Sequence, residues 1–274
     1  MTKTEIANLA VSHIGGKSLT DVDADTTPQA IVCRKWFNLA RDEALGGHAW
    51  NFATKRARLT LTWTALSGVA LANNGSGLIR VTHNTHGMQT GERIHMRKVE
   101  GVTNANGSWY ITRIDNHTFD LQNSVFAGTH TSGTGEWIVA PLFGWSYQHT
   151  LPGGWLKISS VNGLEANEQD SIPYAIEGDK LLCEADVVEL RYVESVSTTT
   201  EWSAPFISAF AYLLASYIAQ DLTGPAGKAL EMRQFYERAI NPKFTSQDSR
   251  NGKGRVIDPS YDSRTVRARS GFVS

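Results

Sequence analysis

The sequence predicts an α+β protein in which helices near the two ends of the chain enclose a long strand-rich region. Apolar residues recur every three to four positions before residue 53 and again after residue 203, a spacing typical of amphipathic helices. After Arg58 the period changes to two and stays strand-like for about eighty residues. The chain has 274 residues, 41% of them hydrophobic and 19% charged, which is enough for one large or two smaller folded domains.

Two helices are predicted in the N-terminal region. The first begins with a capping-box sequence at Thr2–Glu5 and ends at Gly15–Gly16. The second begins at Pro28, which fits a first helical turn because its missing N–H would have no partner there, and ends at Gly46–Gly47. Its apolar stripe comprises Cys33, Trp36, Phe37, Ala40 and Ala44.

Two further helices are predicted near the C-terminal end, over residues 205–221 and 225–240. We expect them to pack against the apolar stripe of the helix that begins at Pro28, with Trp50 and Phe52 on an extended segment filling the core beside it. The charged residues of that helix lie mostly off the stripe: Arg34, Lys35, Arg41, Asp42 and Glu43.

The strand-like region consists of short alternating segments separated by turn sequences rich in Gly and Asn. Predicted strands cover residues 59–63, 78–82, 93–97, 109–114, 118–121 and 136–139. Short strands without intervening helices predict a small barrel or sandwich. We therefore interpret residues 58–140 as an inserted all-β domain, and residues 1–57 with 141–242 as a four-helix body. A hairpin turning at Gly178–Asp179 and a strand over 187–193 give this body a small β-sheet.

Residues 243–274 have too few apolar side chains to form a core, and we expect an extended C-terminal tail that becomes ordered on a partner. From Arg250 onward the tail has six Lys or Arg residues against two Asp. These cations could contact DNA phosphates or an acidic protein groove, and Asp258, Asp262 and the scattered apolar anchors favour a protein. The candidate binding residues are Arg250, Lys253, Arg255, Tyr261, Arg264, Arg267, Arg269 and Phe272.

Catalytic and cofactor motifs are missing from the sequence, and we expect neither an enzyme nor a bound cofactor. No nucleophile elbow or phosphate-binding loop occurs, and Cys33 and Cys183 lie in apolar patterns where cysteine acts as a small hydrophobe. Five histidines fall in the predicted β domain, but strand spacing alone does not bring three or four ligands together, so we expect no metal site.

The net charge of −1 gives the whole molecule no field that would draw it to nucleic acid or to an anionic membrane, and no apolar run approaches the length of about 18 residues that a membrane span needs. Trp109 and Tyr110 leave one alternative open, because aromatic faces bind sugar rings and the β domain could therefore bind carbohydrate.

Several segments, in the same order along the chain, resemble the head-to-tail adaptor family of tailed phages, which includes tail tubular protein A of short-tailed phages. They are the helix Ile6–Gly15, the connector Leu19–Asp25, the helix through Trp36–Asp42, and Trp50–Phe52. The hairpin over residues 174–182, the strand over 189–193 and the two C-terminal helices continue the resemblance. It covers about the first fifty residues and most of residues 141–242.

The inserted region looks like a small β module, the first catalytic cysteine half-domain (FCCH) of ubiquitin-activating enzymes. The matching segments are His86–Ile94, Val99–Val102, Asn106–Ile111 and Asn116–Leu121. Nothing in the chain matches an adenylation site, so ubiquitin chemistry is not implied.

The adaptor resemblance implies a virion protein of the head–tail junction, assembled in the host cytoplasm. Its subunits, twelve in that family, would form a ring between the portal protein and the tail nozzle protein, and genomic DNA would pass through the lumen without sequence-specific binding. The charges off the helical stripe, from Arg34 to Glu43, then become candidates for contacts between subunits. The C-terminal tail becomes a candidate for portal binding.

Overall fold

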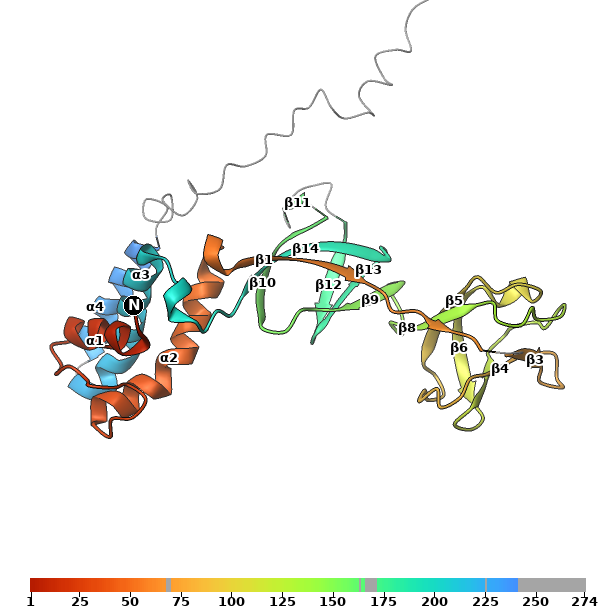
Figure 1. The fold of residues 1–274 in the computed structure, drawn as a ribbon, viewed down its shortest axis with the longest axis horizontal. Helices are drawn as coiled ribbons and strands as arrows, with labels where there is room; N and C mark the ends of the chain where they lie inside the picture. The colour runs from red at the N-terminus through yellow and green to blue at the C-terminus, as the bar shows by residue number, and fades with distance from the viewer. Residues whose placement is uncertain (68–69, 163, 166–171, 225, 241–274) are drawn as a thin grey trace, which may run out of the picture. The chain divides into compact units, whose positions relative to one another are not determined.

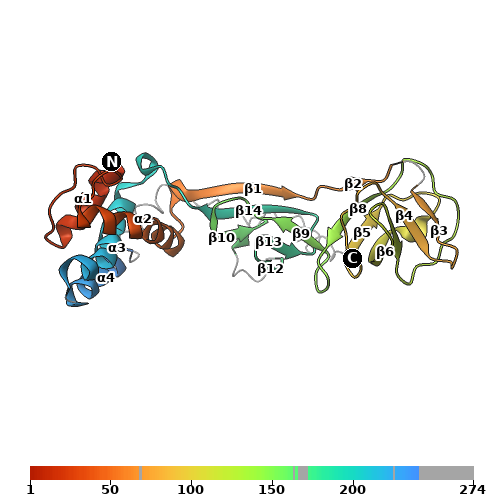
Figure 2. The same ribbon diagram turned by 90° about the horizontal axis from the view of Figure 1, so that it is seen from below.

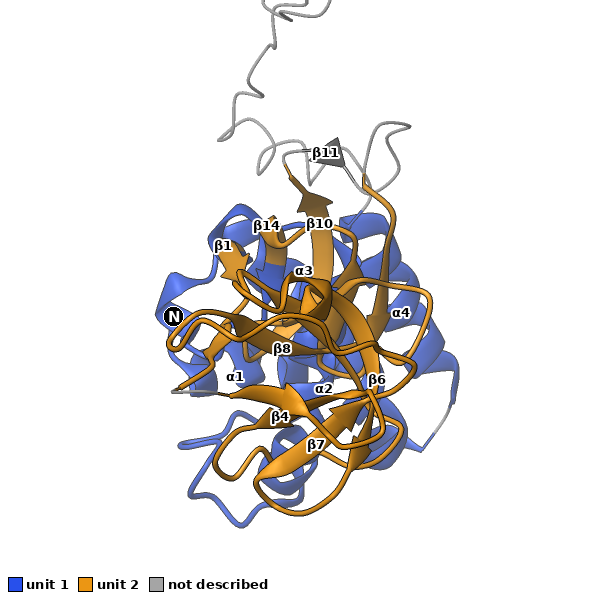
Figure 3. Ribbon diagram, turned by 90° about the vertical axis from the view of Figure 1, so that its right-hand side faces the viewer, with its two compact units in different colours: residues 1–54, 193–274 blue, residues 55–192 orange. Residues whose placement is uncertain are grey.

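The computed structural model describes residues 1–67, 70–162, 164–165, 172–224 and 226–240 (Figure 1). The chain divides into two compact units, Met1–Thr54 with Val193–Ser274 and Lys55–Tyr192, which Figure 3 shows in blue and orange. The first unit is helical and the second is built of strands. The predicted α+β class is therefore confirmed. The boundaries at 57/58 and 140/141 of an inserted domain stay a prediction.

The described residues of the helical unit form four α-helices: α1 Lys3–His13, α2 Pro28–Gly47, α3 Ala204–Thr223 and α4 Ala226–Ala239. Each of the other three helices packs against α3. Ten residues of α3 are buried, which is why its sequence is apolar on nearly every side. The central helix of the unit thus comes from the C-terminal part of the chain.

The helix starts follow the local signals in the sequence. In the capping box of α1, Thr2 Oγ1 accepts a hydrogen bond from the Glu5 amide (3.2 Å) and the Glu5 carboxylate accepts one from the Thr2 amide (2.8 Å). Thr27 caps α2, with Pro28 in the first turn.

An aromatic cluster forms the core between α2 and α3. Phe37 of α2 lies 5.0 Å from Phe210 of α3 between ring centroids, and Trp202 lies 4.9 Å from Phe206. Trp50 is only 1% exposed and contacts Phe206 edge to face at 5.2 Å. The predicted packing of the α2 stripe on α3 is therefore confirmed.

The prediction of an extended backbone at Trp50–Phe52 was wrong in part. Residues Asn51–Ala53 form a 3₁₀ turn, in which the Ala53 amide donates to the Trp50 carbonyl at 3.0 Å. The turn brings both aromatic side chains onto Phe206.

The strands described in the second unit form three sheets. One has the order β1-β14-β10-β11, with β1 Thr54–Thr60, β14 Val187–Glu194, β10 Trp155–Val161 and β11 Leu164–Glu165. A second has the order β12-β13-β9, with β12 Tyr174–Glu177, β13 Lys180–Cys183 and β9 Tyr147–Thr150. The predicted hairpin turns at Gly178–Asp179, because Glu177 pairs with Lys180.

The third sheet has seven strands in the order β2-β8-β5-β6-β7-β4-β3. Their bounds are β2 Thr64–Ala65, β8 Glu136–Ala140, β5 Arg93–Arg97, β6 Gly107–Arg113, β7 Thr118–Leu121, β4 Ile79–Thr82 and β3 Leu71–Asn73. Its core is a separate apolar cluster that includes Ile79, Ile94, Ile111 and Phe119, all fully buried.

Two loops of this seven-stranded sheet touch through glycine backbones. A Cβ on Gly101 would lie 1.8 Å from the Thr129 carbonyl oxygen, and a Cβ on Gly128 would lie 2.1 Å from the Gly101 oxygen. Both glycines have positive φ, 78° and 96°, so a side chain is excluded by both space and conformation.

The chain enters and leaves the strand-rich unit along β1 and β14. These strands are neighbours in one sheet, and they run side by side in Figures 1 and 2. The long strand-rich segment therefore begins and ends at one place. None of the described helices is long and apolar enough to cross a membrane.

Candidate functional site

The charged residues of α2 that were predicted to contact other subunits form bonds within the helical unit. Glu43 accepts hydrogen bonds from the Tyr217 hydroxyl of α3 and from Arg233 Nη2 of α4, both at 2.5 Å. One carboxylate thus joins three helices. The hydrogen bond to Glu43, together with burial, raises the pKa of Tyr217 above its ordinary value.

A second polar contact lies nearer the middle of α2. Asp221 of α3 accepts hydrogen bonds from Trp36 Nε1 (3.1 Å) and Lys35 Nζ (3.2 Å), and these bonds lower the pKa of the Asp221 carboxyl. The Trp36 ring stacks on Tyr217 with centroids 5.1 Å apart. This contact fixes the α2 indole against α3.

Arg41 and Asp42 form a bidentate pair, with Nε to Oδ1 at 2.9 Å and Nη2 to Oδ2 at 3.2 Å. Asp42 also accepts a hydrogen bond from Ser195 Oγ at 2.6 Å. Arg34 donates from Nη1 to the carbonyls of Val22 and Asp25, both at 2.8 Å, and so holds the connector between α1 and α2. Arg34 and Arg41 thus have defined partners inside the monomer.

Sequence reasoning missed these intramolecular partners because most of them lie far away in the chain. Arg233 is 190 positions from Glu43, and Ser195 is 153 positions from Asp42. Among the five predicted residues, Lys35 has the most exposed side chain of those in ion pairs, at 58%. Contact of any of the five with another subunit stays a prediction.

Two large apolar residues of α2, one on either side of Lys35, have exposed side chains. Ile31 and Leu39 are 52% and 53% exposed, and they are spaced four positions on either side of Lys35. Residues at this spacing lie along one face of a helix. We call Ile31, Lys35 and Leu39 the outer α2 stripe. The sequence contains this signal, since two large apolar residues recur outside the core stripe.

Trp109 and Tyr110 do not form one exposed aromatic platform. Trp109 Nε1 donates to the Ala105 carbonyl at 2.8 Å, and its ring packs against the core of the seven-stranded sheet. Tyr110 is 44% exposed and its hydroxyl donates to the Leu142 carbonyl at 2.6 Å. Adjacent residues of a strand point to opposite faces, which separates the two rings.

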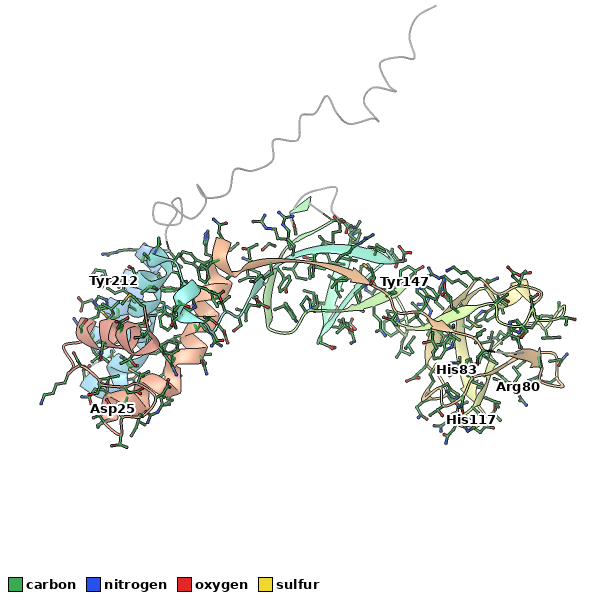
Figure 4. All side chains as sticks on the ribbon, viewed as in Figure 1. Asp25, Arg80, His83, His117, Tyr147 and Tyr212 are labelled. Carbon is green, nitrogen blue, oxygen red and sulfur yellow. The ribbon has the colours of Figure 1, made fainter. Side chains whose placement is uncertain are left out.

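The histidines of the strand-rich unit have separate structural contacts. Nδ1 of His130 accepts from the Ala70 amide at 3.2 Å, and Nδ1 of His117 accepts from the Thr85 amide at 3.1 Å. His83, labelled in Figure 4, meets the Trp137 ring edge to face at 5.4 Å. Among the described residues, no three His, Cys, Asp or Glu side chains lie close enough to hold a metal ion.

The strand-rich unit also has a polar cavity of about 540 Å³. Its wall includes threonine side chains from two segments, a glutamine and two cations: Thr60, Thr62, Thr64, Thr150, Gln148, Arg58 and Lys180. His149, which is 2% exposed, also lines it; its Nε2 bonds to the Ala185 carbonyl at 2.8 Å, while its Nδ1 has no hydrogen-bond partner among the described residues. The cavity can offer hydrogen bonds to a polar ligand.

The predicted portal-binding residues, from Arg250 to Phe272, lie outside the described residues, as does the whole predicted tail over 243–274. The two cysteines, Cys33 and Cys183, are buried and form no disulfide. Burial raises the pKa of the Cys33 thiol to about 11, which keeps it protonated at neutral pH.

The bond between Tyr217 and Glu43 predicts a pH-dependent contribution to stability. Tyr217→Phe removes a hydrogen bond to a carboxylate and should lower the free energy of unfolding by about 1.5–3 kcal/mol near neutral pH. Because the folded-state pKa of Tyr217 is raised, the unfolded chain loses the phenolic proton first as the pH rises. The contribution is therefore complete below about pH 10 and is lost as the pH rises through the folded-state pKa.

Urea unfolding of the parent and of Tyr217→Phe, at about pH 8 and about pH 11, measures this difference. The gap between the two proteins should shrink at the higher pH. Tyr212→Phe on the same helix is the matched control, because the Tyr212 hydroxyl makes no hydrogen bond to another described residue and its removal should show no such change. A gap that stays constant with pH would contradict the proposed linkage.

Comparisons with known proteins leave the family open. No protein-family model matches the chain, and a search of curated proteins found no significant match.

Proposed function

We propose that the protein is a structural head-to-tail adaptor of a tailed phage, which forms a ring between the portal protein and the tail nozzle and lets genomic DNA pass. The outer α2 stripe is the observation that carries the proposal. Ile31 and Leu39 expose large apolar side chains on a helix whose other face is fully packed. Exposed apolar residues on a charged helix face are typical of a protein contact surface.

The resemblance of the N-terminal segments and of residues 141–242 to the adaptor family supports the same proposal. In this proposal the four-helix unit is the ring-forming body, and the ring has about twelve copies by analogy with that family. A net charge of −1 also suits a lumen through which DNA moves without being held. The protein then acts in the virion at the head–tail junction, after assembly in the host cytoplasm, and needs neither a catalytic group nor a cofactor.

Subunit contacts in the proposed ring combine the outer α2 stripe with neighbouring charges. Lys35 and Asp42 keep exposed side chains, at 58% and 37%, although each already has a partner in the monomer. Glu43 and Arg34 are bonded within the monomer, so we expect them to affect ring assembly indirectly, by holding α2 in place. Apolar contact supplies affinity at such a surface, and the charges select the partner.

The double variant Ile31→Asp/Leu39→Asp tests the contact surface. Its side chains are half exposed, so the monomer should keep its helical circular dichroism and nearly its parent stability. Two buried carboxylates at the subunit contact should abolish ring assembly. Leu230→Asp is the control, because Leu230 is 61% exposed on α4 and lies off the stripe. Native mass spectrometry in the presence of the portal protein measures ring assembly. Rings formed by the double variant would contradict the proposed contact surface.

Portal binding by the tail is a separate part of the proposal. Deleting residues 246–274 removes all eight candidate binding residues and leaves every described residue in place. The truncated protein should fold and should no longer bind the portal, as measured by co-sedimentation. Undiminished binding would contradict this part of the proposal, because residues 1–245 would then be sufficient for portal binding.

Carbohydrate binding by a tail-associated protein is the second candidate, and the polar cavity of the strand-rich unit favours it. Hydroxyl and amide groups of Thr60, Thr150 and Gln148 line this cavity and can bond to a polyol. A glycan array should then detect binding that Gln148→Ala weakens at least about tenfold, whereas Trp109→Ala, whose ring belongs to the core, would act only through stability. Absence of any glycan signal would remove this candidate.

A further inference from the structure

An apolar groove lies between α3 and α4 in the helical unit. It has a volume of about 500 Å³, within the range of pockets that hold organic ligands. The start of α3 contributes Ala204, Pro205 and Ser208, and the end of α4 contributes Arg238 and Ala239. Tyr212 and Phe235 form its aromatic wall. The groove therefore lies where α4 ends.

The aromatic wall of the groove is packed against neighbouring rings. The Tyr212 ring, labelled in Figure 4, stacks on His13 at 4.3 Å and lies 5.5 Å from the Phe235 ring. Phe235 is nevertheless 37% exposed, although it is a large apolar residue beside other aromatics. An aromatic wall that is packed on one side and partly exposed on the other can accept an apolar side chain with little loss of conformational entropy.

The chain itself supplies a nearby occupant. The residues that follow Ala239 in the sequence are Ile240, Asn241, Pro242 and Lys243. Phe244 is the first aromatic residue after α4. It is five positions beyond Ala239, and a chain of five residues spans at most about 17 Å. Phe244 can therefore reach a groove that Ala239 itself lines.

The charges near the groove are complementary to the same segment. Arg238 stands at its rim, with its guanidinium 5.9 Å from the Phe235 centroid, and it makes no ion pair with any other described residue. The first acidic residue after α4 is Asp248, four positions beyond Phe244. A segment with Phe244 in the groove can bring this carboxylate to Arg238.

We propose that the groove between α3 and α4 binds the chain's own segment after α4, with Phe244 as its anchor and Asp248 opposite Arg238. The segment attaches the base of the C-terminal tail to the helical unit and sets the point from which residues 249–274 extend. This inference concerns the monomer and does not depend on the adaptor proposal. A second copy of the chain and a foreign peptide are the competing occupants.

A disulfide cross-link in the full chain tests the proposal. Ser208→Cys places a thiol on the exposed groove wall, and Thr245→Cys places one beside the anchor, which stays intact. The native Cys33 and Cys183 are buried and should not compete. Under mild oxidation the double variant should form an intramolecular disulfide whose rate does not depend on protein concentration.

The decisive comparison is between cross-linking rates with and without Phe244, because the two cysteines stay at the same positions. Phe244→Ala in the double-cysteine background should slow cross-linking about tenfold, since the apolar contact that holds the segment is lost. Phe272→Ala, which removes the same side chain further along the tail, should leave the rate unchanged. An equal rate with and without Phe244 would overturn the proposal, and a cross-linked dimer would assign the groove to a second copy and overturn it as well.

Hydrogen exchange provides a check in a chain without added cysteines. In Phe244→Ala, amides in the last turn of α4 and the first turn of α3 should exchange faster than in the parent and in Phe272→Ala. Identical exchange in all three proteins would overturn the proposal even if the cysteine variants failed to fold.

Discussion

The aromatic cluster between α2 and α3 is the contact on which the rest of the structure depends. Phe37 and Trp50 come from the first fifty residues, whereas Trp202, Phe206 and Phe210 come from beyond residue 200. Edge-to-face aromatic pairs contribute about 0.5–1.5 kcal/mol each beyond the area that they bury. Such contacts can offset the cost of joining distant segments, which rises only slowly with the length of the intervening chain. A long strand-rich segment between the two halves of the cluster is therefore tolerated, provided that its two ends lie close together.

That condition explains the pairing of β1 with β14. The strand that leaves the helical unit and the strand that returns to it are neighbours in one sheet. Backbone hydrogen bonds between them satisfy groups that two separate linkers would leave to water. The seven-stranded sheet has its own core around Phe119 and Ile111, and this core contains none of the residues of the aromatic cluster. The helical unit and the seven-stranded sheet thus have separate apolar cores.

Much of this organisation could be predicted from the sequence because its signals are local. The Thr2–Glu5 capping box, Pro28 and the Gly178–Asp179 turn act over a few residues, and the structure has helix starts and a hairpin at those positions. The partners of Glu43 and Asp42 could not be found in this way, since no local rule connects residues more than 150 positions apart. The 3₁₀ turn after Trp50 was missed for a similar reason, because packing on Phe206 competes there with local preference.

The distribution of polar contacts limits how copies of this chain can associate. Glu43, Arg41 and Asp221 already have charged or hydrogen-bonding partners in the monomer, and breaking those bonds to form others would gain little free energy. Affinity must then come from apolar area, which on α2 amounts to Ile31 and Leu39. Two side chains cover far less than the roughly 1,200–2,000 Å² that a stable interface buries. A ring built through this helix therefore needs a second contact, and a tail held by another protein would supply it by raising the local concentration of subunits on that partner. The proposed ring would then form only where a partner protein raises the local concentration of subunits.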